Sequence, residues 1–187
     1  MRYSSHHLRR AVLALRHGGV VAYPTEAVYG LGCDPWNSLA VARVLEMKQR
    51  DPAKGLIVIA AEIAQLLPFI GALPAERRAE IVASWPGPNT WLVPALPTTP
   101  RWLTGQFATL AVRVTAHPLA AALCRSYGGA IVSTSANRAT RHPARTALQV
   151  RRALTLQPDV CLVGACGERR QPSLIRDAQT GRVVRAG

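Results

Sequence analysis

Short runs rich in Val and Ile alternate along this chain with segments whose apolar residues recur at helical spacing. The runs are bounded by Gly, Pro or Asn, which is typical of strands in a sheet. The segments between them contain Ser, Thr or Pro at positions where helices commonly begin. Strands and helices that interleave without a strict strand–helix–strand count predict a single α/β domain with a mixed sheet.

The expected elements follow from this pattern. Strands are expected at residues 20–23, 56–60, 90–95, 109–115, 130–135, 160–164, 173–177 and 182–186. Helices are expected from Ser4 or Ser5 to Gly18, and at residues 38–48, 74–85, 117–127 and 146–154. Ser38 is the expected N-cap of the second helix, and Pro94 indicates an edge strand. Residues 24–35 read as a glycine-containing loop, and residues 94–105 are a candidate lid or rim.

Length and composition limit the class of protein. The 187 residues suit one domain, residues 1–187, and 49% hydrophobic residues are enough for a core. No apolar run approaches the roughly 20 residues of a membrane span, and the N-terminus lacks the pattern of a signal peptide. The four cysteines form no CxxC pair, so we expect free thiols and no structural metal. These features predict a cytoplasmic protein.

The charge of the chain indicates an anionic ligand. Lys and Arg total 23 against 10 Asp and Glu, for a net charge of +13, which attracts nucleic acid, nucleotides and phosphates. Both lysines, Lys48 and Lys54, lie with Arg50 in "KQRDPAKG", directly before an expected buried strand. A solvated basic loop is one explanation. The other is a polyanion held between loop and sheet, because three such cations can clamp a triphosphate and stabilise a departing pyrophosphate.

Two expected strands carry polar residues. In "AIVSTSAN", alternation puts Ser133, Ser135 and Asn137 on one face at the strand's C-terminal end, where α/β sheets tend to bind ligands. A Ser or Asx turn explains this stretch equally well. In "TLAVRVT", Arg113 shares its face with small residues, and an unpaired Arg there is costly. Its partner is either a structural carboxylate or the carboxylate or phosphate of a ligand.

Several standard motifs are excluded. The chain has no GxxxxGK[ST], HExxH or GxSxG, and "GLGCDP" has Pro35 where a dinucleotide fingerprint needs its third glycine. After the strand at 20–23, Thr25 presents a hydroxyl and Glu26 is a base or a cap. By themselves these two residues indicate only a turn.

Taken together, "YPTEAVYGLGCDP", "KQR", "KGLIVIAA", "WPGPNTW", "LAVRVTAHP", "STSAN" and "PSLIRDAQTGRVVRAG" occur in the order and spacing of the YrdC/TsaC family, the threonylcarbamoyl-AMP synthases. From about Val20 to Gly187 the chain resembles the short, single-domain bacterial form. The resemblance implies a YrdC-like α/β fold, with a twisted mixed sheet flanked by helices and a basic concave cleft. Two departures are "RAT" at 138–140, where the family often has Ser-Gly, and Leu174, where many relatives have Thr.

The resemblance also implies an activity. A nucleotidyltransferase of this family forms L-threonylcarbamoyladenylate and pyrophosphate from L-threonine, bicarbonate or CO2, and ATP. Mg²⁺ would arrive with ATP, because the chain shows no carboxylate cage for it. TsaB/TsaD/TsaE-type proteins would use the product for N6-threonylcarbamoyladenosine (t6A) in tRNA, beside the anticodon. The alternative is a non-catalytic RNA-binding protein that uses the basic cleft to contact tRNA or other RNA. The chain lacks an RNP aromatic pattern, which weakens this alternative.

The matching motifs carry site residues over to this sequence. The resemblance implies ATP contacts at Lys48, Arg50, Lys54, Ser135, Asn137 and Arg185, of which Lys48 and Arg50 are also the expected catalytic residues. It implies threonine contacts at Thr25, Arg113, Ser133 and Ser173, and it implies no protein ligand to a metal.

Overall fold

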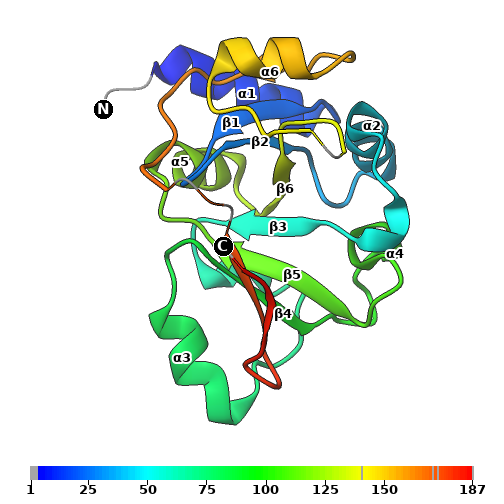
Figure 1. The fold of residues 1–187 in the computed structure, drawn as a ribbon, viewed down its shortest axis with the longest axis vertical. Coiled ribbons are helices and arrows are strands. Elements are labelled where there is room, and N and C mark those ends of the chain that lie inside the picture. Colours follow the sequence, from blue (N-terminus) through cyan, green and yellow to red (C-terminus); the bar gives the residue numbers. More distant parts are fainter. Residues whose placement is uncertain (1–3, 140, 170, 172, 187) are drawn as a thin grey trace.

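The structure, a computed structural model, describes residues 4–139, 141–169, 171 and 173–186 (Figure 1). The α-helices are α1 (Ser5–Arg16), α2 (Ser38–Lys48), α3 (Arg78–Ala83), α4 (Arg101–Thr104), α5 (Pro118–Tyr127) and α6 (Ala147–Ala153). Short 3-10 helices are η1 (Pro52–Lys54), η2 (Ile63–Leu66) and η3 (Ala75–Arg77). The strands are β1 (Val21–Pro24), β2 (Tyr29–Gly32), β3 (Ile57–Ala60), β4 (Asn89–Pro94), β5 (Thr109–Val114), β6 (Ile131–Ser135), β7 (Val160–Cys161), β8 (Leu174–Asp177) and β9 (Val183–Arg185). Thr140, part of the departure after Asn137, lies outside the described residues.

The strands of the described part of the chain form one sheet in the order β7-β1-β2-β6-β3-β5-β4-β8-β9. The pairs β7/β1, β3/β5 and β4/β8 are parallel, and the other neighbouring pairs are antiparallel. The sheet is twisted and helices flank it, as Figure 1 shows. The predicted α/β class with a mixed sheet is therefore confirmed.

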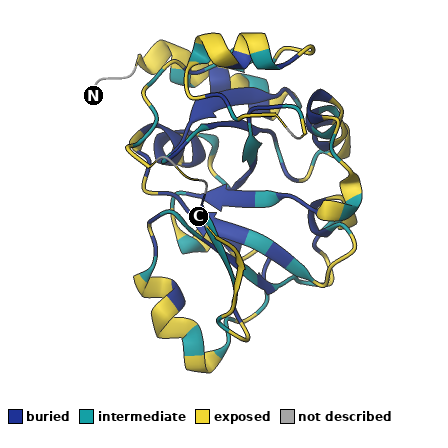
Figure 2. Ribbon diagram, viewed as in Figure 1, coloured by how far each residue is buried: buried dark blue, intermediate teal, exposed yellow. Residues whose placement is uncertain are grey.

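Alternation along the central strands divides the core between the two faces of the sheet. Val58 is paired with Val112 on one side and Val132 on the other, and all three are buried in a cluster that includes the inner face of α2. Ile59 and Ile131 point to the opposite face and are buried in a second cluster with residues of α1 and α5. The central strands are therefore covered on both faces, which Figure 2 shows as buried ribbon.

The expected loop at residues 24–35 contains a strand instead. Residues 29–32 form β2, which pairs with β1 on one side and with β6 on the other. Two glycines make this stretch a weak strand by propensity. The structure explains one of them, because a Cβ at Gly32 would lie only 2.5 Å from the carbonyl oxygen of Val132 and 2.9 Å from Cε1 of Tyr23.

The predicted edge position of Pro94 is wrong. β4 lies between β5 and β8, so it is an interior strand. The proline is tolerated because the pairing of β4 with β8 extends only from Asn89 to Leu92. The predicted cap of α2 is also wrong, because Asn37 and not Ser38 accepts a hydrogen bond, from the backbone N–H of Ala40 at 3.0 Å.

The segment at residues 94–105, expected as a lid or rim, is packed and contains α4. Leu103 in this helix is fully buried, and the hydroxyl of Thr99 donates to the carbonyl of Phe69 at 2.5 Å. The expected strand at 160–164 is shorter than predicted and covers only β7. The four cysteines are free. No helix among the described residues is long and apolar enough to cross a membrane.

Candidate active site

The face of the sheet that packs against α1 and α5 continues past these helices into an open cleft. Along β6, Ile131 is buried in the cluster with α5, whereas Ser133 and Ser135 on the same face line the cleft. Ile57 of β3 is paired with Ser133, and Gly30 of β2 is paired with Ser135. The predicted alternation is confirmed for Ile131, Ser133 and Ser135, and it brings hydroxyl groups to the open end of this face. It is wrong for Asn137, which lies beyond the end of β6 and does not line the cleft.

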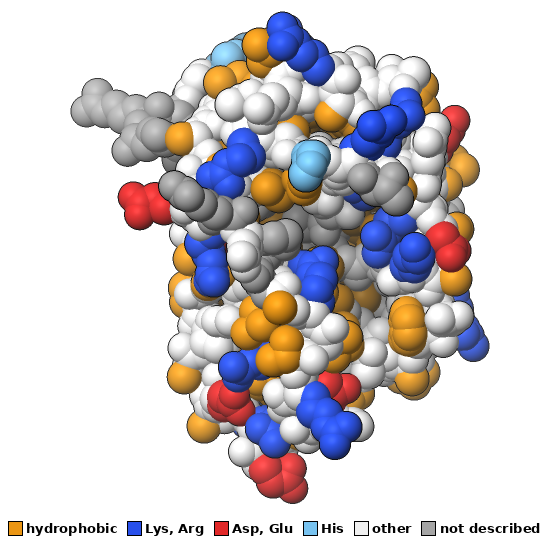
Figure 3. Space-filling model, viewed as in Figure 1, with side chains coloured by type: hydrophobic (Ala, Val, Ile, Leu, Met, Phe, Trp, Pro, Cys, Tyr) orange, Lys and Arg blue, Asp and Glu red, His pale blue; other side chains and the backbone are white. Residues whose placement is uncertain are grey.

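The cleft is lined mainly by charged and hydroxyl-bearing side chains that come from distant parts of the chain. Its charged lining residues are Glu26, Arg50, Arg113, Arg169 and Arg185, and its hydroxyl-bearing ones are Thr25, Tyr29, Ser133, Thr134, Ser135 and Ser173. Figure 3 shows Lys and Arg side chains around the hollow in this face.

The structure brings seven of the ten sequence-predicted site residues together in this cleft: Thr25, Arg50, Arg113, Ser133, Ser135, Ser173 and Arg185. The other three, Lys48, Lys54 and Asn137, do not line it. Lys54 lines an adjoining, more apolar pocket beside β3, β5 and β9. This pocket shares Arg50, Ile57 and Arg185 with the cleft, so the two spaces are neighbours.

Lys48 lies behind the cleft and is only 3% exposed. Its ammonium donates to the backbone carbonyls of Ser135 and Asn137, the second at 2.8 Å. The side chain of Asn137 donates in turn to the carbonyls of Arg138 at 2.9 Å and Arg141 at 2.6 Å. In this structure, Lys48 and Asn137 therefore hold the segment that follows β6 in place.

A left-handed residue separates Lys48 from Arg50. Lys48 is the last residue of α2 and belongs to its buried face with Val44. Gln49 has φ 50° and ψ 47°, which ends the helix and turns the chain. Arg50 thereby reaches the cleft, where its Nη2 donates to the carbonyl of Gly55 at 2.9 Å. Its Nε is buried and has no hydrogen-bond partner within the described residues.

Burial, and then the positive charge of Arg50, lower the pKa of Lys48 from 10.5 to about 8. The unfolding free energy of the wild type is therefore expected to rise relative to that of Lys48→Met as the pH increases from about 8 to 10.5. In this interval the unfolded chain binds the proton of Lys48 and the folded protein does not, so stability increases with pH. Below this interval both states bind the proton and the difference is constant.

Denaturant titrations of the two proteins across this pH interval measure the effect. Because both proteins share every other titrating group, the comparison isolates Lys48. A difference in unfolding free energy that does not change with pH would contradict the lowered pKa.

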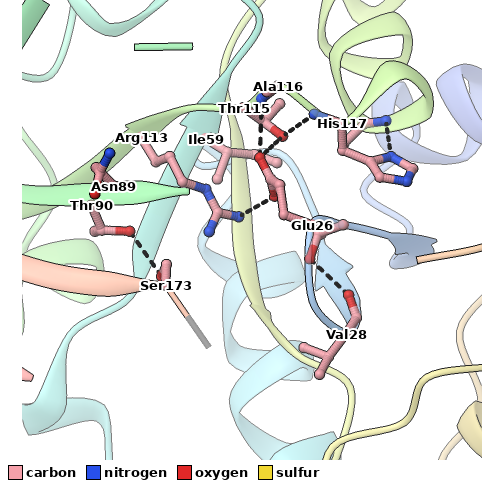
Figure 4. A network of polar contacts seen from close by, with 12 residues as sticks. Glu26, Val28, Ile59, Asn89, Thr90, Arg113, Thr115, Ala116, His117 and Ser173 are labelled. Atoms are coloured by element: carbon pink, nitrogen blue, oxygen red, sulfur yellow. Dashed lines mark hydrogen bonds and ion pairs between the residues drawn. The ribbon is translucent and has the colours of Figure 1, made fainter. Parts of the chain in front are cut away.

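Arg113, in β5, is paired with the neighbouring Glu26 in the lining of the cleft (Figure 4). It is 7% exposed, and its Nη2 lies 3.5 Å from Oε2 of Glu26. Oε1 of Glu26 accepts hydrogen bonds from the hydroxyl of Thr115 at 2.7 Å and the N–H of Ala116 at 3.0 Å. Burial alone would raise the pKa of Glu26, but the charge of Arg113 and these hydrogen bonds outweigh it and hold the pKa below its usual value.

Both partners that the sequence left open for Arg113 are compatible with this geometry. Glu26 is a structural carboxylate beside the guanidinium. Arg113 nevertheless lines the cleft, and its buried Nε has no hydrogen-bond partner in the described part of the chain. Because Arg113 lines the cleft, its guanidinium can also meet an anion there.

Arg185 closes the cleft from β9. Its Nη2 donates to the carbonyl of Ser173 at 3.0 Å, and the hydroxyl of Thr90 donates to that of Ser173 at 3.0 Å. Burial of its guanidinium, and then the charges of Arg113 and Arg50, lower the pKa of Arg185. The three arginines thus repel one another, and an anion bound among them would relieve this repulsion.

The sequence missed some residues of the cleft. Arg169 and Gly30 line it without having been singled out, and Glu26 was interpreted only as a base or a cap. Gly30 allows a close approach, because a Cβ there would lie 3.3 Å from Oγ of Ser133. The one available signal for Arg169 was its position just before the segment that contains Ser173. Within the described ranges, no group of three His, Cys, Asp or Glu side chains is arranged to hold a metal ion.

Known proteins share this sequence and fold. A family model for Sua5, YciO and YrdC proteins, described as "Telomere recombination", matches residues 13–187. The threonylcarbamoyl-AMP synthase of Alkalilimnicola ehrlichii is 56% identical over 183 residues, which are 96% of this chain and 95% of that protein. The enzyme of that name from Halorhodospira halophila is 54% identical over 178 residues, 95% of this chain and 93% of that protein.

The crystal structure of P. abyssi Sua5 complexed with L-threonine has a TM-score of 0.91 and 30% identity. The match covers 98% of this chain and 54% of that one, so the chain spans about half the length of that protein. Full-length HypF in its phosphate- and nucleotide-bound form shares the fold, with a TM-score of 0.81 at 19% identity. Family model, close relatives and fold agree, and the chain belongs to the Sua5/YciO/YrdC family.

Proposed function

We propose that this chain is a threonylcarbamoyl-AMP synthase, which forms L-threonylcarbamoyladenylate and pyrophosphate from L-threonine, bicarbonate or CO2, and ATP. One observation carries the proposal. Arg50, Arg113 and Arg185 meet in one cleft with hydroxyl groups, in a chain more than half identical to proteins named for this activity.

The chemistry of this reaction suits such a cleft. The threonine amine adds to CO2 to give a carbamate, and a carbamate oxygen then attacks the α-phosphorus of ATP while pyrophosphate leaves. Two anions have to meet, so cations and a water-poor site matter more than a covalent nucleophile. A cleft with four arginines and one glutamate supplies the positive charge.

The residues of the cleft divide between the two substrates in this proposal. Arg113 binds the threonine carboxylate, with Thr25, Ser133 and Ser173 around the amino acid. Arg50 and Arg185 bind phosphate oxygens of ATP, and Ser135 lies between the two substrates. ATP enters as its Mg²⁺ complex. The contacts that Lys48 makes support a second role for it, because it fixes the backbone of Ser135 from behind.

Lys54 lies in the adjoining pocket, where it extends the positive charge beyond the cleft. In the folded chain, Asn137 bonds its own loop and so supports Ser135 rather than facing the cleft. Their roles toward ATP are therefore proposed as electrostatic and supporting ones.

The product contains a mixed anhydride that water can hydrolyse, so it has to be consumed quickly. We expect TsaB/TsaD/TsaE-type proteins to receive it in the cytoplasm and to transfer the threonylcarbamoyl group to tRNA. The net charge of +13 is consistent with an additional contact between this chain and RNA.

Pyrophosphate release tests the proposal. Complete mixtures of ATP, threonine and bicarbonate should release pyrophosphate, and omission of threonine or bicarbonate should each abolish it. An RNA-binding protein without catalysis predicts no release in any mixture, together with RNA binding that weakens steeply with salt. Release that does not depend on threonine would contradict the proposed activity.

Serine is expected to replace threonine only partly. The two amino acids differ by one methyl group, which a fitted apolar pocket discriminates by roughly 1–3 kcal/mol, or about 10- to 200-fold. The ratio of kcat/KM for threonine and serine in the pyrophosphate assay gives this difference. Equal values for the two amino acids would argue against a pocket fitted to threonine.

A further inference from the structure

Glu26 is the one carboxylate among the described residues that line the cleft, and it shares this lining with four arginines. A cluster of arginines alone would attract phosphates and carboxylates but would repel a cationic group. In the proposed reaction, threonine enters this cleft with its α-ammonium group. Glu26 therefore supplies the only formal negative charge that the described lining offers to that group.

The two oxygens of Glu26 have different surroundings (Figure 4). Oε1 accepts two hydrogen bonds, from Thr115 and Ala116, which fix the carboxylate. Oε2 is buried and accepts no hydrogen bond within the described residues. Its separation of 3.5 Å from Nη2 of Arg113 exceeds the roughly 2.7–2.9 Å of a charge-assisted hydrogen bond. Oε2 thus has no hydrogen-bond donor among the described residues, and because Glu26 lines the cleft, a small shift of its carboxylate would offer this buried oxygen to a ligand.

An α-amino acid carries its ammonium and its carboxylate on the same carbon atom. Arg113 and Glu26 present the two opposite charges side by side, with Nη2 of Arg113 3.5 Å from Oε2 of Glu26. A zwitterion that lies across the pair would meet a guanidinium with its carboxylate and a carboxylate with its ammonium. Each charge would then be paired twice, once within the protein and once with the ligand.

We propose that Oε2 of Glu26 binds the α-ammonium group of the amino-acid substrate and selects α-amino acids over the corresponding hydroxy acids. This inference rests on the proposed function for the identity of the substrate. The lowered pKa of Glu26 keeps the carboxylate charged at neutral pH, which suits an anchor and not a proton acceptor. Removal of the ammonium proton before carbamate formation is not assigned to Glu26.

A purely structural role for Glu26 is the competing explanation. Its bonds to Thr115 and Ala116 hold the turn before α5, and its charge balances Arg113. Loss of such a role would weaken every ligand of the cleft to a similar extent. Loss of an ammonium contact would weaken only ligands that carry an ammonium group.

Calorimetric titration of two ligands separates these roles. The ligands are L-threonine and (2S,3R)-2,3-dihydroxybutanoate, in which a hydroxyl replaces the ammonium group. The proteins are the wild type, Glu26→Gln and the control Glu80→Gln. Glu80 lies on α3, pairs with Arg77 and Arg176, and is absent from the cleft lining, so its substitution removes the same charge elsewhere.

The wild type and Glu80→Gln are expected to bind threonine at least about tenfold more tightly than the hydroxy acid, because a charge-assisted hydrogen bond is lost with the ammonium group. Glu26→Gln should lose about tenfold in threonine affinity and keep its affinity for the hydroxy acid, so that the preference disappears. Equal losses for both ligands, or an unchanged preference in Glu26→Gln, would overturn the proposal.

Two further results keep the test decisive. If Glu26→Gln does not fold, the wild type alone still decides, because equal affinity for both ligands would exclude an ammonium contact. Failure of the proposed function is detected separately, by pyrophosphate release from the wild type. A wild type that binds threonine with the expected preference but makes no product would retain the ammonium site and lose the synthase assignment.

Discussion

Replacement of Arg113 by alanine is expected to reduce threonine-dependent pyrophosphate release by about a hundredfold or more while ATP binding changes little. A hydrogen bond to a charged group contributes roughly 1.5–3 kcal/mol, and a guanidinium can make two to one carboxylate. Their loss corresponds to two or more powers of ten in kcat/KM. Arg113→Lys should recover only part of the activity, because an ammonium cannot reproduce a two-pronged contact.

Stability measurements separate the substrate contact of Arg113 from its ion pair. Arg113→Ala leaves the buried Glu26 without its partner and is expected to cost on the order of 3 kcal/mol of unfolding free energy. The double variant Arg113→Ala/Glu26→Gln removes both charges, so it should recover most of that stability. It should not recover threonine-dependent turnover.

Three results would contradict this account of Arg113. One is wild-type use of threoninol, which lacks the carboxylate, as readily as threonine. Another is an Arg113→Ala variant with weaker ATP binding and unchanged threonine affinity. The third is a double variant that regains both stability and turnover, which would reduce Arg113 to a structural partner of Glu26.

Arg50→Ala is expected to reduce ATP turnover at least about tenfold and to leave the fold intact, because a charged contact in a shielded site contributes roughly 1.5–3 kcal/mol. Within the described residues the Arg50 side chain makes one hydrogen bond, to the carbonyl of Gly55, so its truncation should cost little stability. The matched control is Arg10→Ala, on the exposed face of α1, which also removes one positive charge. Steady-state kinetics with ATP as the varied substrate give the comparison.

Lys48→Ala is expected to lose at least as much turnover, but with a loss of stability as well. The carbonyls of Ser135 and Asn137 would lose their buried donor, and an unsatisfied buried acceptor costs about 1–3 kcal/mol. Unchanged ATP turnover in both Arg50→Ala and Lys48→Ala would contradict the role of this basic segment. A Lys48→Ala variant as stable as the wild type would contradict the positioning role.

The positions of the cleft residues on the central strands were predictable because they follow from local alternation. A period of two placed Ser133 and Ser135 on one face of β6, and it placed Arg113 opposite the apolar face of β5. The expense of burying an arginine also indicated correctly that Arg113 needs a partner. These inferences need only the residue types and their spacing.

The sequence could not show how Lys48 and Arg50 diverge. They are two residues apart in the sequence, and their side chains diverge because Gln49 between them is left-handed. Glutamine seldom adopts this conformation, so nothing in the sequence indicated it. The sequence also could not show β2, where Gly32 is explained only by the close approach of β1 and β6. Long-range packing decides both features.

The contribution of the C-terminus was likewise beyond local reasoning. Ser173 and Arg185 reach the cleft because β8 pairs in parallel with β4, whose residues lie far away in the sequence. The order of the family motifs indicated these residues, but their spacing alone gives no reason for the pairing.

The most direct test of the synthase assignment is identification of the nucleotide product. The wild type would be incubated with ATP, L-threonine and ¹³C-labelled bicarbonate, and the products would be analysed at once by mass spectrometry. The proposed reaction predicts an adenylate that contains threonine and one carbon from bicarbonate, formed in equal amount to pyrophosphate. An adenylate of threonine without the labelled carbon, or pyrophosphate with AMP alone under conditions in which authentic threonylcarbamoyladenylate survives, would contradict it.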